Sequence, residues 1–398
     1  MKIILKRRKL HIYTYFLALY FFLAPMEDLL TGSLGTMAKY IALLFVLAGI
    51  IENRGRFVFY RKAEDILIIV LTVIGVLSLL WSIDQQTTLS RLPAYILLPG
   101  YCVFIGLLDF ERKDFEFISK AAVFGGLFTV GYLIFSGRLS ATGRITIAES
   151  SDPNNFAALL LLPIALCFQK RESNKKVYIV FYSAIAILLL FCMLLTGSRG
   201  GLLSIGAVAA AFLLLTSANK KVLYLVLFGI LLLLIWLYVL PRLPQRIRWR
   251  LFDSESYLAS EAREENRAHI WKNVLYSVLP NMKMWGLGAG CSGLALSNVY
   301  GHVKGVHNTY LNIICEYGVF GIGFFVAFLS VLFVKLKSRG CYLELACLIG
   351  MCVLIFFLDS YQKKYFWNVI MIAYLAIKTL PVQNKESMRS RLRLNRSV

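Results

Sequence analysis

The chain has 398 residues, of which 59% are hydrophobic and only 16% are charged, and its formal net charge is +21. This composition excludes an ordinary soluble domain. The positive charge does not indicate a nucleic-acid partner either, because the basic residues are scattered over short segments between apolar runs. We therefore expect an integral membrane protein whose basic residues face lipid head groups and which binds no nucleic acid.

Apolar stretches long enough to cross a membrane as helices recur along the whole chain. They are expected at about residues 11–27, 34–51, 65–83, 92–108, 118–136, 153–168, 177–196, 202–217, 222–240, 307–334, 342–359 and 365–380. The first is interpreted as a retained helix, since no small-x-small cleavage site follows it. The sequence predicts an all-α fold, with residues 1–398 forming a single polytopic membrane domain of about 12 transmembrane helices.

The Lys and Arg residues predict the orientation of the helices. Placing the N-terminus in the cytoplasm puts 27 of the 43 basic residues in cytoplasmic segments, and the short outer loops then hold six. Both termini are therefore expected to be cytoplasmic. In this orientation residues 241–306, between the ninth and tenth helices, form a long extracytoplasmic loop.

The first candidate residues lie in the outer segment that precedes the sixth helix. Asp152 followed by Pro153 predicts a helix start, because Asp caps the first amides and Pro suits the first helical position. Arg138 and Arg144 are the basic residues of this otherwise basic-poor loop. They either contact a phosphate group or are simply solvated.

The sequence LLTGSRGGLLS joins the seventh and eighth helices with almost no loop, and Arg199 lies at its tip. An arginine inside a membrane costs about 2.5–3.5 kcal/mol on insertion scales, so it usually has an anionic partner or reaches toward water. Glu149 and Asp152 are separated from it by an intervening helix pair, which favours an anionic ligand for Arg199.

Two amphipathic helices are expected within the 241–306 loop. Leu243, Ile247 and Leu251 recur every four residues beside a basic stripe, which is typical of a helix at the membrane interface. In the second, Arg267 precedes Trp271 by one turn. Arg267 either pairs with Glu264 on the same helix face or has a functional role.

A glycine-rich segment leads from Trp285 to the tenth helix, where His307 and Asn308 stand. Histidine exchanges protons near neutral pH, with an unperturbed pKa of about 6.5, so His307 is a candidate general base. Asn308 is a candidate for binding a sugar hydroxyl. No cluster of His, Cys, Asp or Glu has metal-ligand spacing, and we expect neither a metal ion nor another cofactor.

The pattern His307-Asn308, nine residues, Gly318-x-x-Gly321 resembles the signature of the bacterial O-antigen ligase and O-antigen polymerase superfamily. TGSRGG around Arg199, Arg267-x-x-x-Trp271 followed by NMKMWGLGAG, and SSDPNNFA at the sixth helix are also similar to that family. The resemblance implies a membrane glycosyltransferase in the bacterial cytoplasmic (inner) membrane, with an extracytoplasmic active site. Its donor would be a glycan linked to undecaprenyl diphosphate, and its acceptor a second glycan or a lipid.

The resemblance further implies that Arg199, Arg267 and His307 are the catalytic residues. The arginines would stabilise the leaving diphosphate, and His307 would take the proton of the acceptor hydroxyl. Asn308, Arg144 and Arg138 would bind substrate. The outer loops contain no Asp-x-Asp pair, so a metal-independent transfer is expected. An O-antigen-type ligase, a polymerase of O-antigen or capsular polysaccharide, and a transporter or flippase of lipid-linked glycans all remain compatible with the sequence.

Overall fold

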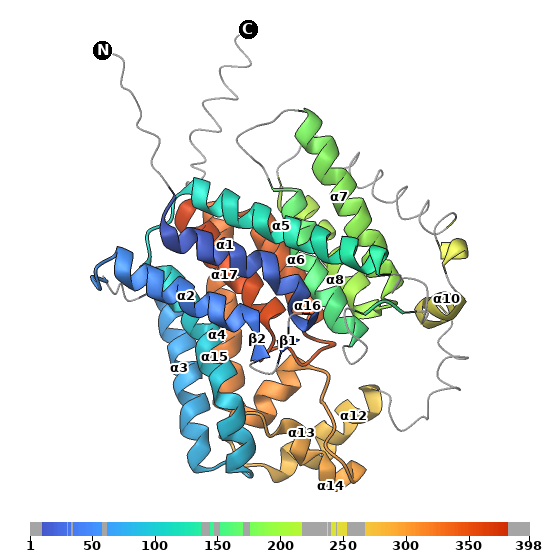
Figure 1. Ribbon diagram of the computed structural model, residues 1–398. Helices are drawn as coiled ribbons and strands as arrows, with labels where there is room; N and C mark the ends of the chain where they lie inside the picture. The colour runs from blue at the N-terminus through green and yellow to red at the C-terminus, as the bar shows by residue number, and fades with distance from the viewer. Residues whose placement is uncertain are drawn as a thin grey trace, which may run out of the picture.

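The computed structural model describes residues 10–29, 31–32, 35–57, 62–136, 144–146, 152–169, 176–216, 237, 240–243, 245–252 and 267–380. Almost all regular structure in these residues is helical (Figure 1). The strands that the structure describes are a two-residue antiparallel pair, β1 (Thr31–Gly32) and β2 (Gly35–Thr36).

Eleven of the expected membrane helices coincide with helices of the structure. They are α1 (Ile12–Leu23), α2 (Met37–Glu52), α3 (Ala63–Leu77), α4 (Gln85–Leu107), α5 (Arg112–Phe135), α6 (Pro153–Cys167), α7 (Lys176–Leu195), α8 (Arg199–Leu215), α15 (Thr309–Arg339), α16 (Tyr342–Leu354) and α17 (Lys364–Thr379). The expected helix at 222–240 lies almost wholly outside the described residues.

Within the described part of the chain, five elements are long and apolar enough to cross a membrane, namely Ala63–Leu80, Gln85–Leu107, Arg112–Phe135, Lys176–Leu195 and Thr309–Arg339. Four shorter apolar helices accompany them, at Ile12–Met26, Pro153–Cys167, Arg199–Leu215 and Tyr342–Leu354. The structure thus confirms an all-helical protein of membrane type. The total of twelve membrane helices stays a prediction.

Helix α4 begins at Gln85, well before the expected start at residue 92. Its first turns, QQTTLSR, are polar, so hydrophobicity alone could not mark them as helical. Asp84 starts the helix by accepting hydrogen bonds from the backbone amides of Gln86 and Thr87. Hydrogen bonds from Thr87 lower the pKa of Asp84, which keeps this cap ionised at neutral pH.

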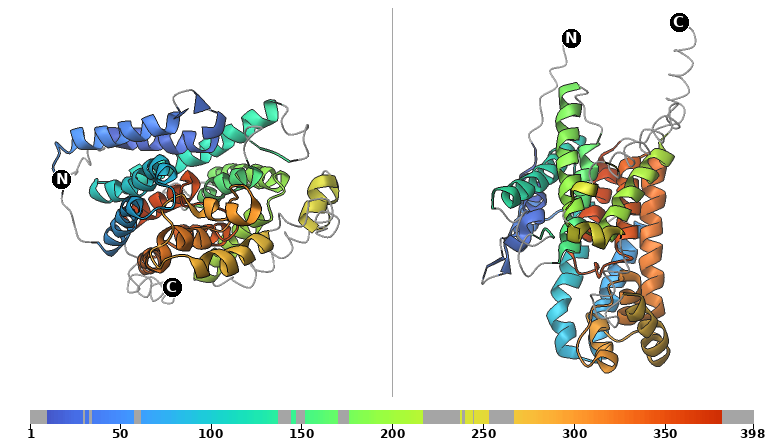
Figure 2. Two further views of the ribbon diagram at one scale, coloured as in Figure 1. Left: turned by 90° about the horizontal axis from the view of Figure 1, so that it is seen from below. Right: turned by 90° about the vertical axis from the view of Figure 1, so that its right-hand side faces the viewer.

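Helix α17 lies at the centre of the bundle (Figure 2). Every residue from Tyr365 to Ala376 is buried, and the helix packs against α4, α5, α6, α15 and α16. A helix that is apolar on all sides is expected in such an interior position. Outward-facing apolar side chains on α2, α3 and α7, such as Leu43, Ile69 and Ile179, suit contact with lipid.

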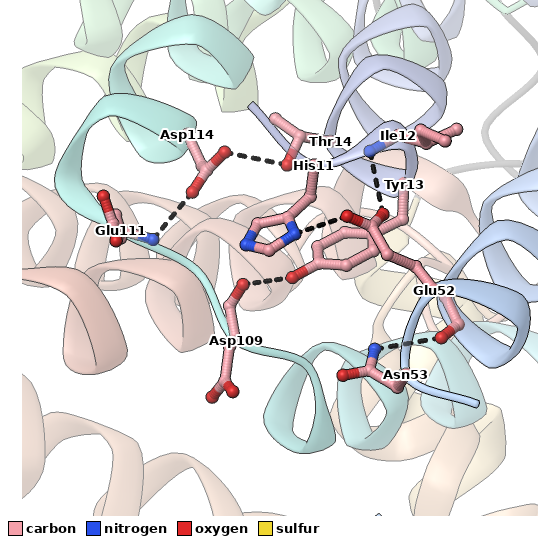
Figure 3. Close-up of polar contacts among 10 residues, drawn as sticks. His11, Ile12, Tyr13, Thr14, Glu52, Asn53, Asp109, Glu111 and Asp114 are labelled. Atoms are coloured by element: carbon pink, nitrogen blue, oxygen red, sulfur yellow. Dashed lines mark hydrogen bonds and ion pairs between the residues drawn. The ribbon is translucent and has the colours of Figure 1, made fainter. Parts of the chain in front are cut away.

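Helices α1, α2 and α5 run across the view of Figure 1, whereas α3, α4 and α15 run from top to bottom. Polar contacts join α1 to α2 and to α5 near the start of α1 (Figure 3). His11 pairs through Nδ1 with Glu52 at 2.6 Å, and the Glu52 carboxylate also accepts the backbone N–H of Ile12 at 2.9 Å. Thr14 of α1 donates to Asp114 of α5 at 2.9 Å.

The segment before α15 contains α10 (Gln245–Phe252), α12 (Arg267–Asn273), a π-helical turn (Val274–Val278), α13 (Ser292–Ala295) and α14 (Ser297–Tyr300). Short 3₁₀ turns occur at Ala24–Leu29, Ser78–Leu80, Leu240–Arg242 and Leu279–Asn281. Both expected amphipathic helices are present. Leu243, which precedes α10, and Ile247 within it are buried in the main core, and Leu251 packs against that core, so the apolar stripe packs on the protein itself.

Helices α12, α13 and α14 lie at the foot of Figure 1 together with the turn between α3 and α4. The backbone joins these two regions, because the N–H of Ile83 donates to the carbonyl of Leu287 at 3.0 Å. We call this end of the bundle the lower end. It carries His307 and the features described next.

Candidate functional site

His307 has an unusual backbone conformation, with a positive φ of 53°. Non-glycine residues seldom adopt this left-handed region, and such strain persists only where neighbouring structure imposes it. Here Asp359 imposes it. Its Oδ2 accepts the backbone N–H of His307 at 2.9 Å, and its Oδ1 accepts that of Asn308 at 3.1 Å. Asp359 therefore fixes the backbone from which the imidazole projects.

Asn308 caps the N-terminus of α15. Its side-chain oxygen accepts the backbone N–H groups of Tyr310 at 3.0 Å and Leu311 at 3.1 Å, and the residue is only 2% exposed. Such a cap satisfies amides that have no partner within the helix. The described function of the Asn308 side chain is thus to start α15, and sugar binding by this residue stays a prediction.

The loop between α16 and α17, residues 355–363, connects most of the motifs at the lower end. Besides the contacts of Asp359, the carbonyl of Ile355 accepts the backbone N–H of Thr309, and the carbonyl of Leu358 accepts the Thr309 hydroxyl. Ser360 contacts the hydroxyl of Tyr365, which in turn donates to Asn155 at the start of α6. We call this segment the α16–α17 loop. It fastens α15 and the SSDPNNFA motif to one another.

Arg199 is the first residue of α8 and is exposed. The tight turn expected before it is present, with Gly197 at φ 62° and the Ser198 hydroxyl accepting from the amide of Gly201 at 3.2 Å. Arg144 reaches the same turn, since its Nε donates to the carbonyl of Thr196 at 2.9 Å. The structure thus brings Arg144 and Arg199 to one turn, although 55 positions separate them in the sequence.

The start of α8 packs against the α16–α17 loop through Gly200, the second residue of the helix. A Cβ on Gly200 would lie 3.2 Å from Cβ of Phe357, so a larger residue would push the two elements apart. Phe356 and Phe357 also contact Trp271, with ring centroids 5.1 and 6.4 Å away. The aromatic contacts therefore join α8, α12 and the loop.

Arg267 begins α12, one turn before Trp271. The indole Nε1 of Trp271 donates to the carbonyl of Val306 at 3.1 Å, directly before His307. Ile270, Val274 and Val278 are buried on one face of this segment, whereas Leu275 is 46% exposed. Glu264, the alternative partner of Arg267, lies outside the described residues, and so does Arg138.

The glycines of the motif make a close backbone contact possible. Gly318 has φ 69° and interrupts α15, and a Cβ there would lie 1.8 Å from the carbonyl oxygen of Met284. The amides of Leu287 and Gly288 donate to the carbonyls that the kink exposes, those of Cys315 and Glu316. The GLGAG segment is therefore a fixed part of this kink, and three of its amides, those of Gly286, Leu287 and Gly288, already donate to protein carbonyls.

Glu316 lies buried behind this kink and does not face His307 in any described contact. Its carboxylate accepts hydrogen bonds from Tyr95 of α4 and from Ser292, the latter at 2.9 Å. Gln362 of the α16–α17 loop donates to the Tyr95 hydroxyl at 2.5 Å. Burial raises the pKa of the neighbouring Tyr361, which keeps its hydroxyl protonated.

Sequence reasoning missed Asp359, which lies at the end of the eleventh expected span, beside a short loop that the sequence predicts on the outer side. The signal that could have found it is an acidic residue at a membrane helix end facing the same side as His307. Among the described residues, no group of three or more His, Cys, Asp or Glu side chains lies close enough to hold a metal ion.

These features define a polytopic helical membrane protein with a rigid histidine and two arginine-bearing helix starts at one end of the bundle. Residues 184–326 match the family model described as O-antigen ligase, which confirms the resemblance to the O-antigen ligase and polymerase superfamily. The match includes Arg199, Arg267, His307 and Gly318, and it ends before Asp359. No curated protein matches the chain.

Proposed function

We propose that the protein is a membrane glycosyltransferase that moves a glycan from an undecaprenyl-diphosphate carrier to an acceptor hydroxyl on the outer face of the cytoplasmic membrane. The observation that carries the proposal is the fixed backbone of His307, held by Asp359 beside the elements that bear Arg199 and Arg267. Strained residues held by their surroundings cluster at functional sites.

The reaction requires little beyond these groups. The acceptor oxygen attacks the anomeric carbon of the donor sugar, and the bond from that carbon to the diphosphate oxygen breaks. The bonding electrons leave with the diphosphate, whose growing charge Arg199 and Arg267 stabilise through bidentate hydrogen bonds. His307 takes the proton of the acceptor hydroxyl, an effect typically worth about 10²–10⁴-fold.

Arg144 is proposed to bind the donor beside Arg199, because both approach the turn between α7 and α8. Arg138 and Asn308 are proposed as further substrate-binding residues, as the family resemblance implies. Transfer to a lipid or other surface acceptor, as in an O-antigen ligase, is the form we favour. A second lipid-linked glycan as acceptor would make the protein a polymerase with the same donor chemistry.

The test uses the purified protein in nanodiscs with a lipid-linked oligosaccharide donor and alternative acceptors. Arg199→Ala, Arg267→Ala and His307→Ala should each abolish release of the undecaprenyl diphosphate while the protein keeps its melting temperature. In cells the same variants should accumulate donor whose glycan faces outward. Donor trapped in the inner leaflet in these variants, together with no transfer by the wild-type protein in nanodiscs, would contradict the proposal and indicate a flippase.

A further inference from the structure

The end of the bundle opposite His307, which we call the upper end, contains a cavity of about 410 Å³. It lies where α3 begins and where α4, α15 and α17 end. Its wall carries four cationic side chains and one carboxylate, with the hydroxyls of Ser338 and Tyr374. The charged residues are Lys62, Glu64, Lys335, Arg339 and Lys378.

Hydrogen bonds to the helix ends hold two of the cations in place. Lys62 Nζ donates to the carbonyl of Gly106 at 3.2 Å, and Lys378 Nζ donates to the same carbonyl at 3.0 Å and to that of Leu108. Both lysines thereby reach the C-terminal end of α4, where the helix dipole favours positive charge. They gather two like charges at one carbonyl.

The charges of the side chains that line the cavity do not add up to zero. Lys335 pairs with Glu64, so this pair is neutral as a unit. Lys62, Lys378 and Arg339 then leave three positive charges on the wall. Asp65 and Asp109, which interact electrostatically with Lys378 from outside the wall, offset part of this excess. An anion inside the cavity would offset the rest.

A buried tyrosine also lines this cavity. Tyr374 is 5% exposed, and its hydroxyl interacts with the carboxylate of Asp65, which lies beside Gly106. A phosphate in the cavity would offer the Tyr374 hydroxyl an alternative acceptor.

We propose that this cavity binds the phosphate of an anionic phospholipid head group. Guanidinium, ammonium and hydroxyl groups around one space are the donors that a phosphate needs. The location favours a lipid over a soluble phosphate, because the cavity lies at the ends of membrane helices and Ile377 forms part of its wall. Basic pockets between helix ends are a known form of head-group site in membrane proteins. The proposal does not depend on the glycosyltransferase function.

The test measures binding of phosphatidylglycerol to the full-length protein in detergent by native mass spectrometry. Phosphatidylcholine and inorganic phosphate serve as comparison ligands. Arg339→Gln should weaken phosphatidylglycerol binding by about tenfold or more, because it removes a charged donor to the phosphate. Lys337→Gln is the matched control, since Lys337 is an exposed cation on the last turn of the same helix and does not line the cavity.

Preferential binding of phosphatidylglycerol that is lost in Arg339→Gln and kept in Lys337→Gln supports the proposal. Equal weakening in both variants, or equal binding of phosphatidylcholine, overturns it. Competition by inorganic phosphate without lipid binding overturns the lipid assignment and indicates a soluble phosphate compound. If Arg339→Gln does not fold, the wild-type protein is washed with mixed micelles of detergent and phosphatidylcholine. Anionic lipid that stays bound after washing supports the proposal, and its complete loss overturns it.

Discussion

His11 and His307 lie at opposite ends of the bundle, and each lies beside one carboxylate. The two carboxylates bind different parts of the histidines. Glu52 binds the ring of His11 and the amide of Ile12, so this histidine helps to join α1 to α2. Asp359 binds the backbone of His307 and leaves its ring to other contacts. The described contacts thus position the His307 imidazole through its main chain, whereas those of His11 use a ring nitrogen.

The largest expected effect comes from removing the imidazole at the lower end. His307→Asn should lower the rate of glycan transfer by about 10²–10⁴-fold, because it removes the proposed base. Asn tolerates a positive φ better than most residues, so the backbone should keep its conformation. His11→Asn is the control and should transfer at nearly the wild-type rate in nanodiscs. Comparable rates for the two variants would remove the distinction between the histidines.

Gly318→Ala should damage the fold of the lower end. The added methyl meets the Met284 carbonyl at 1.8 Å and the residue has φ 69°, so we expect a loss of more than about 3 kcal/mol. Gly323→Ala, five residues along the same helix, meets no atom within 4 Å and should be neutral or slightly stabilising. Thermal unfolding of both variants in detergent checks this. Equal melting temperatures would show that the kink is not required.

Asp359→Asn should slow transfer by about 10–100-fold with little change in KM, because misplacing a catalytic group by about 1 Å has effects of this size. The amide supplies one acceptor oxygen where the carboxylate supplied two, so one of the two backbone N–H groups loses its partner. Steady-state kinetics with a lipid-linked donor measure the change. A rise in KM alone would assign Asp359 to substrate binding instead.

Gly305→Ala offers a milder disturbance of the same geometry. Its new methyl would lie 3.0 Å from Asp359 Oδ2 and 3.5 Å from Nε2 of His307. Transfer should fall by about three- to tenfold through a displaced ring, on the same positioning argument. The melting temperature should change little, since the residue is exposed. An unchanged rate would show that the ring tolerates displacement.

The smallest effect is expected at the upper end. Glu52→Gln weakens the contact with His11, and partly exposed pairs of this kind contribute up to about 1 kcal/mol. The melting temperature should fall slightly while transfer stays at the wild-type rate. A loss of transfer as large as that of Asp359→Asn would mean that the two carboxylates have equivalent roles.

The sequence was sufficient for eleven of the expected helices, apart from the polar first turns of α4, because hydrophobic runs are local features. The cap formed by Asn308 follows the ordinary preference of helix starts, although sugar binding was the hypothesis drawn from it. Asp359 could not be linked to His307 from sequence. The 52 positions between them carry no periodicity that records a contact across the bundle.

The glycine pattern shows a second limit of sequence reasoning. Gly318 belongs to the signature used for the resemblance, but its physical role depends on Met284, which approaches it from the preceding segment. Likewise, Arg144 reaches the turn before Arg199 only because the chain between them folds back as α6 and α7. Such contacts arise from tertiary packing rather than from local propensity.

The most direct test is an experimental density map of the protein with undecaprenyl diphosphate bound. We expect the diphosphate at the lower end, within hydrogen-bonding distance of Arg199 and Arg267, with the His307 ring facing the sugar position and its backbone still held by Asp359. A diphosphate bound away from these side chains, or arginine side chains directed to separate surfaces, would contradict it.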